Sequence, residues 1–227
     1  MTLKISLGFV AILSACGGGN APYEPNIDPA HFVSGVTNPF FPLVPGTVFT
    51  YDVVETGEHV VVTVTSDTIV AKGVTCMIVH DVASVNDVVA EDTFDYYAQD
   101  DQGNLWYFGE DTTAFDGGMS TKEGSWQAGV DGAQPGIIVE GTPKVGDTYR
   151  QEFLEGEAED EGEVVSLDAS ITVPFGSFTG CLETRDFTAL EPDTEEHKYY
   201  CPGTGQVEAH TTKGGAEHEQ LTSVVGP

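Results

Sequence analysis

Acidic side chains gather around one predicted turn of this chain, and they could bind a hard cation. Asp95, Asp100, Asp101 and Glu110 lie on or beside the turn-rich run 100–104. Carboxylates and loop carbonyls are the ligands that calcium prefers, so these four residues form a candidate calcium site. The run lacks the alternating acids of an EF-hand loop. A turn with solvated acids explains the same residues without a metal.

A Gly-rich central segment, residues 109–144, contains apolar side chains that need burial. Long irregular segments are uncommon inside a compact domain unless they are functional or disordered, and the aromatic content argues against disorder. We expect the segment to fold over one end of a β-structure and to line a pocket. The alternative is a lid that only plugs an open barrel end. The apolar contacts of the pocket would be Trp106, Phe108, Trp126, Ile137 and Ile138.

No recognisable catalytic motif occurs in the sequence. It contains no Gly-x-Ser-x-Gly nucleophile elbow, no His-Glu-x-x-His and no phosphate-binding glycine loop. His197 and Cys201 are four residues apart, which gives one face in a strand, but this is a weak zinc signal. We therefore expect a protein that is not an enzyme, with a hydrolase as the least favoured alternative.

Two cysteines are placed to form a disulfide. If residues 178–187 and 196–200 pair as a hairpin centred near Glu191, Cys181 and Cys201 lie directly opposite each other. An exported protein can form such a bond. Cys76 would then be unpaired, and we expect it to be a buried small hydrophobic residue.

The first residues have the pattern of a lipoprotein signal peptide. Lys4 precedes an apolar stretch, 5–13, that is too short to span a bilayer, and Leu-Ser-Ala then leads to Cys16. We expect residues 1–15 to be removed and Cys16 to be acylated, which would anchor the protein to a membrane. The residue after Cys16 is Gly17, which by resemblance to the sorting rule of diderm lipoproteins favours the outer membrane. The alternative is an ordinary signal peptide with an incidental cysteine.

Charge excludes one class of partner. Without residues 1–15 the chain keeps 7 basic and 37 acidic residues, a net charge of −30. A chain this acidic is repelled by nucleic acid, so we expect no nucleic-acid partner. Cation binding and a solvated, salt-adapted surface are the two interpretations of the acids.

Strand signals occur throughout, and we predict an all-β fold. β-Branched and aromatic runs occupy residues 59–65, 76–80, 94–98, 105–108 and 170–173. Residues 45–49 recur as 145–149, and Tyr-Tyr pairs recur about a hundred residues apart, which indicates a duplicated antiparallel meander. The two meanders would form one sandwich or barrel, with 109–144 as a long central loop. We expect a signal peptide (1–15), a flexible tether (16–37), a first repeat (38–108), the central loop (109–144) and a second repeat (145–227).

One stretch resembles a known group of proteins. Asp-Tyr-Tyr-Ala-Gln-Asp at 95–100, followed by Gly-Asn-Leu-Trp-Tyr-Phe-Gly-Glu at 103–110, is similar to a family of uncharacterised exported bacterial proteins. No activity is known for that family, so the resemblance implies none here. The function that we expect is a lipid-anchored, cell-envelope β-domain acting as a non-enzymatic binding or assembly module. The alternatives are a carrier of a small apolar ligand with a barrel cavity, or a calcium-binding envelope protein. Its partners would be the membrane, through Cys16, and another envelope protein or a small apolar ligand.

Overall fold

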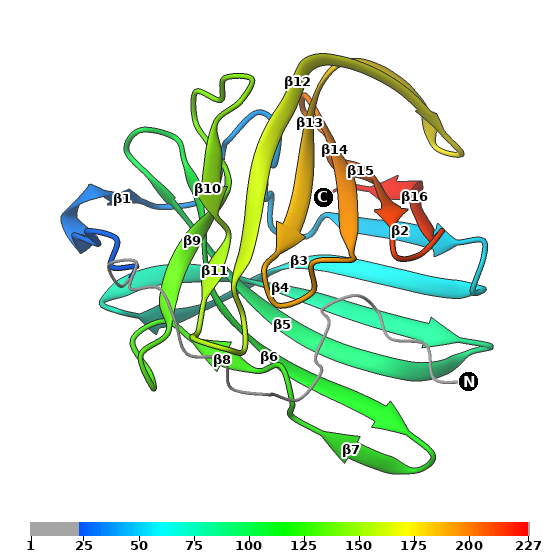
Figure 1. Cartoon of the computed structure of the whole chain (residues 1–227), viewed down its shortest axis with the longest axis horizontal. Helices are drawn as coiled ribbons and strands as arrows, with labels where there is room; N and C mark the ends of the chain where they lie inside the picture. The colour runs from blue at the N-terminus through cyan, green and yellow to red at the C-terminus, as the bar shows by residue number, and fades with distance from the viewer. Residues whose placement is uncertain (1–22, 227) are drawn as a thin grey trace.

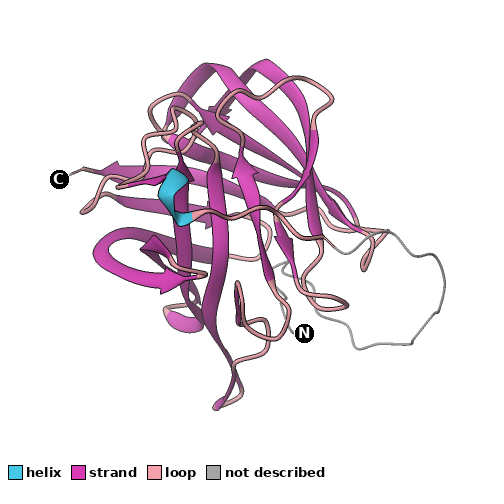
Figure 2. Ribbon diagram, turned by 90° about the vertical axis from the view of Figure 1, so that its left-hand side faces the viewer, coloured by secondary structure: helices cyan, strands magenta, loops and turns pink. Residues whose placement is uncertain are grey.

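The β-branched and aromatic runs of the sequence form long antiparallel strands. The computed structural model describes residues 23–226, so residues 1–15 and the predicted lipidation site Cys16 lie outside the described residues. Among residues 23–226 the helical part is one short 3-10 turn, η1, Pro29–His31. Figure 2 shows that strands make up most of the remainder and that loops connect them. No helix of this part of the chain is long and apolar enough to cross a membrane.

The strands form one sheet whose elements can be followed in Figure 1. The strands before the chain midpoint are β1 (Phe32–Val33), β2 (Val48–Val53), β3 (Glu58–Ala71), β4 (Val74–Val85), β5 (Val88–Asp100) and β6 (Leu105–Asp116). Short strands follow: β7 (Met119–Thr121), β8 (Trp126–Gln127), β9 (Gln134–Val139), β10 (Thr148–Arg150) and β11 (Glu152–Phe153). The last strands are β12 (Asp160–Val173), β13 (Gly176–Thr188), β14 (Glu195–Cys201), β15 (Gly205–Lys213) and β16 (His218–Val225).

The sheet curls into a nearly closed barrel. Its strand order is β10-β12-β13-β14-β15-β16-β2-β3-β4-β5-β6-β9-β11, and the two end strands are separated in the chain only by Gln151. Residues 148–150 pair with β12 and residues 152–153 pair with β9, so one short segment joins both edges of the sheet. Gly136 on β9 permits this crossing, because a Cβ there would collide with the backbone of Arg150 and Gln151. The predicted all-β fold is therefore confirmed, and of the two expected forms, a sandwich or a barrel, the structure has the barrel.

The two halves of the sheet repeat the same hydrogen bonds. Gly46 N donates to Val64 O at 2.8 Å, and Gly146 N donates to Val164 O at the same distance. The amides of Val64 and Val164 donate back to residues 47 and 147, both at 2.9 Å. These contacts agree with the repeat expected from 45–49 and 145–149.

Two segments differ from their sequence-based description. The part of the predicted tether that the structure describes, 23–37, lies against the barrel: β1 pairs with β5, and Tyr23 donates to the carbonyl of Pro135. The predicted central loop 109–144 contains the second half of β6 and all of β7, β8 and β9. Both predictions were wrong because these residues lack a regular alternation of apolar and polar side chains and are rich in glycine. Their structure comes from pairing with strands that are distant in the sequence.

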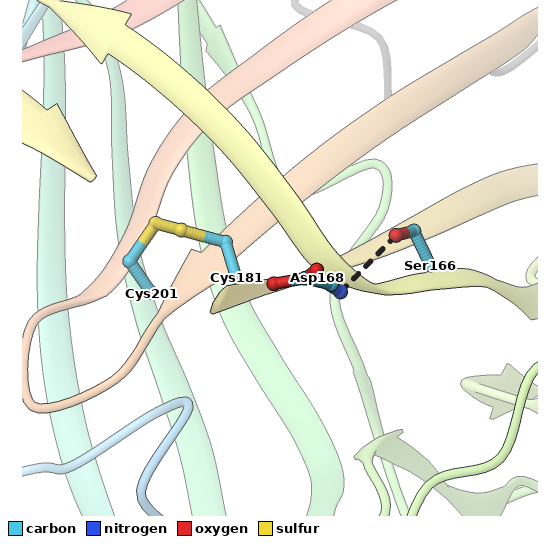
Figure 3. The surroundings of a disulfide bond; sticks show 4 residues. All are labelled: Ser166, Asp168, Cys181 and Cys201. Atoms are coloured by element: carbon cyan, nitrogen blue, oxygen red, sulfur yellow. Dashed lines mark hydrogen bonds between the residues drawn. A yellow bond between two sulfur atoms is a disulfide. The ribbon is translucent and has the colours of Figure 1, made fainter. Parts of the chain in front are cut away.

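The predicted disulfide closes one end of the β13–β14 hairpin (Figure 3). Leu182 lies opposite Tyr200 in the register, which places Cys181 beside Cys201 and centres the hairpin on residue 191, as expected. Both cysteines are fully buried within the apolar core at that end of the barrel. Cys76 is buried in a second apolar cluster and is a free thiol, so that prediction is also confirmed.

Candidate functional site

The interior of the barrel is not filled by its apolar core. A cavity of about 290 Å³ lies between the two halves and adjoins a second one of about 110 Å³. Asp81, Asp95 and Tyr97 line both cavities. Loop residues such as Glu157 and Glu191 contribute to the lining of the larger cavity, which is close to the lower limit of ligand pockets in size.

Carboxyl groups dominate this cavity. Of the described residues that line the larger one, nine carry a carboxyl group and only Lys198 carries an ammonium group. Seven of the nine acids are on strands: Asp81, Asp95, Glu110, Glu152, Asp160, Asp186 and Glu196. Such a concentration of one charge inside a protein is costly, since buried charges need partners.

A β-bulge turns the first acids inward. Asp95 pairs with Glu110 and Tyr97 with Tyr107, so three residues of β6 oppose two of β5. The extra residue places Tyr107 and Glu110 on the same face of the sheet, beside Asp95 and Tyr97. Gly109 is required at this bulge, because it has a φ of 129° and a Cβ there would collide with the backbone of Trp126.

The second half of the barrel has a matching bulge, but a basic residue lies beside it in place of the acid. Lys198 pairs with Ala209 and Tyr200 with Gln206, so three residues of β15 again oppose two of β14. Lys198 therefore occupies the position in its hairpin that Asp95 occupies in the first half. The sequence showed the repeated Tyr-Tyr pair but not this exchange of an acid for a base.

Lys198 is held by two acids. Its Nζ lies 3.1 Å from Asp186 Oδ2 and 3.4 Å from Glu196 Oε2. Asp186 also accepts hydrogen bonds from Gln151 at 3.0 Å and from the Thr184 hydroxyl at 2.7 Å. Burial disfavours the ammonium form, yet the negative charges of Asp186 and Glu196 raise the pKa of Lys198 well above its ordinary value. This part of the cavity is a satisfied ion pair.

Among the described residues, none places such a cation in the opposite part of the cavity. Burial raises the pKa of Asp95 to about 7, despite the hydrogen bond that Tyr107 donates to it at 2.7 Å. Burial and then repulsion by Asp95 raise the pKa of Glu110 to about 8. Burial, assisted by neighbouring acids, also raises the pKa values of Glu152 and Asp81 well above the ordinary range. These groups hold protons in place of a positive partner.

Glu152 is a buried acid of this part of the cavity without a cationic partner among the described residues. Its side chain is 4% exposed. Its close polar neighbours are the carboxyl of Asp160 and the indole of Trp126. The Trp126 N–H is itself buried without an acceptor in residues 23–226.

The predicted calcium ligands do not form one site. Asp95 and Glu110 face the cavity, whereas Asp100 accepts hydrogen bonds from the amides of Gln102 and Asn104 and from the Asn104 side chain and the Trp106 indole. Asp101 lies outside the barrel and contacts His31 at 2.7 Å. Within the described part of the chain, no three His, Cys, Asp or Glu side chains are arranged to hold a metal. The local turn competes for Asp100 and Asp101, and neighbouring positions in a strand point to opposite faces.

The predicted apolar contacts do not line a common pocket either. Phe108 is fully buried in the cluster outside the barrel, and Trp106 is partly buried against the same cluster. Trp126 packs edge-on against Tyr107, with ring centroids 5.4 Å apart. Ile138 lines the cavity, whereas its neighbour Ile137 is half-buried and does not. The aromatic rings that do face the larger cavity include Tyr97 and Tyr107, which lie within the motif singled out at 95–110.

Comparisons with known proteins add little to this description. No protein-family model matches the chain, and no curated protein matches it. The fold is similar to the 2.70 Å crystal structure of a "putative lipoprotein from Parabacteroides distasonis ATCC 8503", with 12% sequence identity and a TM-score of 0.45. The similarity covers 82% of this chain and 98% of that one. A likeness at this level carries no argument about a ligand or a location.

Proposed function

We propose that this protein is a lipid-anchored envelope binding protein that holds a small ligand inside its barrel, without catalysing a reaction. The observation that carries the proposal is the cavity between the two halves, whose lining includes nine residues with a carboxyl group and only Lys198 with an ammonium group. Polar groups buried without partners are costly, and a bound molecule that pairs with them lowers this cost. The lipid anchor rests on the pattern of residues 1–16 alone.

The polar lining of the cavity argues against a carrier of an apolar ligand. A carrier of an apolar ligand would line its cavity almost entirely with aliphatic and aromatic side chains, whereas here nine of the twenty lining residues carry a carboxyl group. The ligand is therefore polar. An assembly module would bind no ligand in the cavity, so a change to the cavity wall would have no effect on ligand binding.

One observation favours a second candidate, a hydrolase. Asp95 and Glu110 are paired across adjacent strands, and their pKa values, about 7 and about 8, suit a general acid and base. A carboxyl pair of this type cleaves glycosidic bonds in other proteins. Turnover of aryl glycosides that is lost in Glu110→Gln would support this candidate over simple binding.

A pair of isoleucine variants tests whether the cavity binds. Ile138→Phe places a larger side chain at the cavity wall, and Ile137→Phe makes the same change one residue away, outside the lining. Native mass spectrometry of the Cys16→Ser protein, mixed with a panel of anionic, neutral and cationic small molecules, would detect bound ligands. We expect a ligand that binds the parent and Ile137→Phe but not Ile138→Phe. Equal binding to all three proteins, or to none, would contradict an internal site.

A further inference from the structure

We propose that the ligand is an organic amine with two positive charges, held between the acids of the cavity that lack a cationic partner as Lys198 is held by Asp186 and Glu196. This inference rests on the proposed function and specifies the ligand of the same cavity.

The two halves of the cavity differ in their charge balance. Asp186 and Glu196 surround the ammonium of Lys198, while the corresponding position of the first repeat is an acid, Asp95. Asp81 occupies the position that corresponds to Asp186, because Val62–Asp81 and Gly162–Asp186 are equivalent pairs. Each half thus supplies one acid at this matching place, but only the second supplies the cation. An ammonium group from outside would complete the first half.

Two acids show that the partner is missing. Glu152 is 4% exposed and lines the cavity, and its close polar neighbours are the carboxyl of Asp160 and the indole of Trp126, not a cation. Asp81, which is half-buried, lines both cavities and has no ion pair among residues 23–226. Carboxyl groups removed from water normally have a positively charged partner. A positively charged donor that reaches both explains them together.

The arrangement of the acids favours an amine over a metal ion. They are spread over β4, β5, β6 and β11, and within the described residues no three of them converge on one point as metal ligands do. An ammonium group accepts such spacing, because it has three N–H donors and needs fewer oxygen partners than the six to eight that calcium takes. The rings of Tyr97 and Tyr107 provide faces for cation–π contact.

The second cavity could bind the second positive charge of the ligand. It adjoins the first at Asp81 and Asp95 and contains a further acid, Glu219, on β16. Burial raises the pKa of Glu219 to about 7, as it does for the acids of the larger cavity. A linear molecule with an amine at each end would therefore meet a carboxyl group in both cavities.

The test uses the Cys16→Ser protein and 1,4-diaminobutane as the probe, at fixed ionic strength. Calorimetric titration should show saturable binding of one diamine, with no comparable binding of 1,4-butanediol, which has the same carbon chain without charge. Glu152→Gln should weaken diamine binding at least tenfold. The matched control is Glu155→Gln, which makes the same charge change on an exposed loop nearby and should leave the affinity unchanged. Because Glu152→Gln replaces a carboxyl without a cationic partner by a neutral amide, we expect it to fold.

The outcomes separate this inference from the proposed function. Binding of the diol as tightly as the diamine would overturn the charged ligand and leave an internal binding site in place. Calcium binding that equals the diamine and depends equally on Glu152 would replace the amine by a metal. Equal losses in Glu152→Gln and Glu155→Gln would mean attraction to the acidic surface only and would overturn the inference. Absence of any bound molecule, together with no effect of Ile138→Phe, would overturn both proposals.

Discussion

Replacing Glu110 by glutamine should make the protein less sensitive to alkaline pH. Glu110 is 5% exposed, and burial together with Asp95 raises its pKa from 4.5 to about 8. A carboxyl whose folded pKa is raised contributes stability below pH 4.5, and this stability is lost as the pH rises towards 8. The free protein should therefore unfold more easily at pH 8 than at pH 5.

The size of the stability loss follows from the raised pKa of Glu110. Between pH 5 and pH 8, a carboxyl with this shift removes roughly 3 kcal/mol from the free energy of unfolding. Glutamine carries no titratable proton, and its amide oxygen can still accept the hydrogen bond that Thr112 donates to Glu110. Removing Glu110 also lessens the repulsion on Asp95, so the variant should recover at least this amount at pH 8 relative to pH 5.

Urea unfolding at pH 5, 6.5 and 8 measures the effect directly. The matched control is Asp111→Asn, which removes the neighbouring acid on the outer face, where it pairs with Lys122. That exposed pair should change the pH dependence by less than about 1 kcal/mol. If Glu110→Gln retains the full loss of stability between pH 5 and pH 8, the acids of the cavity are not held in a protonated state and the reasoning fails.

Three further predictions concern the frame around the cavity. Replacing both Cys181 and Cys201 by alanine removes a crosslink between residues 20 positions apart in the sequence. This change should lower the free energy of unfolding by roughly 3 kcal/mol. Adding a reductant should not change the stability of the double variant further. Gly109→Ala should destabilise the protein by more than about 2 kcal/mol, because the residue has a positive φ and the new Cβ would collide with the Trp126 backbone. The control in the same unfolding assay is Gly176→Ala, where a Cβ would have no atom within 4 Å. Cys76 should resist iodoacetamide in the folded protein and react on unfolding, since burial raises the pKa of its thiol to about 12; rapid native labelling would contradict this.

The sequence was sufficient for the strands and for local pairing. Runs such as 59–65 and 170–173 combine β-branched residues with turn signals at their ends, and they lie within β3 and β12. The disulfide followed from hairpin symmetry about residue 191, which depends only on the residues between the two cysteines. Local chemistry determines both features.

The cavity could not be read from the sequence, because it depends on contacts between distant segments. The bulge at Gly109 turns Glu110 to the face that Tyr107 occupies, which reverses the assignment that simple alternation gives. Glu152 becomes a cavity residue because 148–153 closes the barrel between β12 and β9. Asp160 lies in a segment rich in acids, 155–163, whose sequence does not show that this one side chain lines the cavity. The excess of acid was visible, but its concentration inside the barrel was not.

A crystal structure of the protein with 1,4-diaminobutane tests the central claim most directly. The account predicts density for the diamine inside the barrel, with one nitrogen within hydrogen-bond distance of Asp95, Glu110 or Glu152 and the other directed towards Glu219. Diamine bound only to acids on the outer surface, with the cavity unchanged, would contradict the claim that the barrel interior is the binding site.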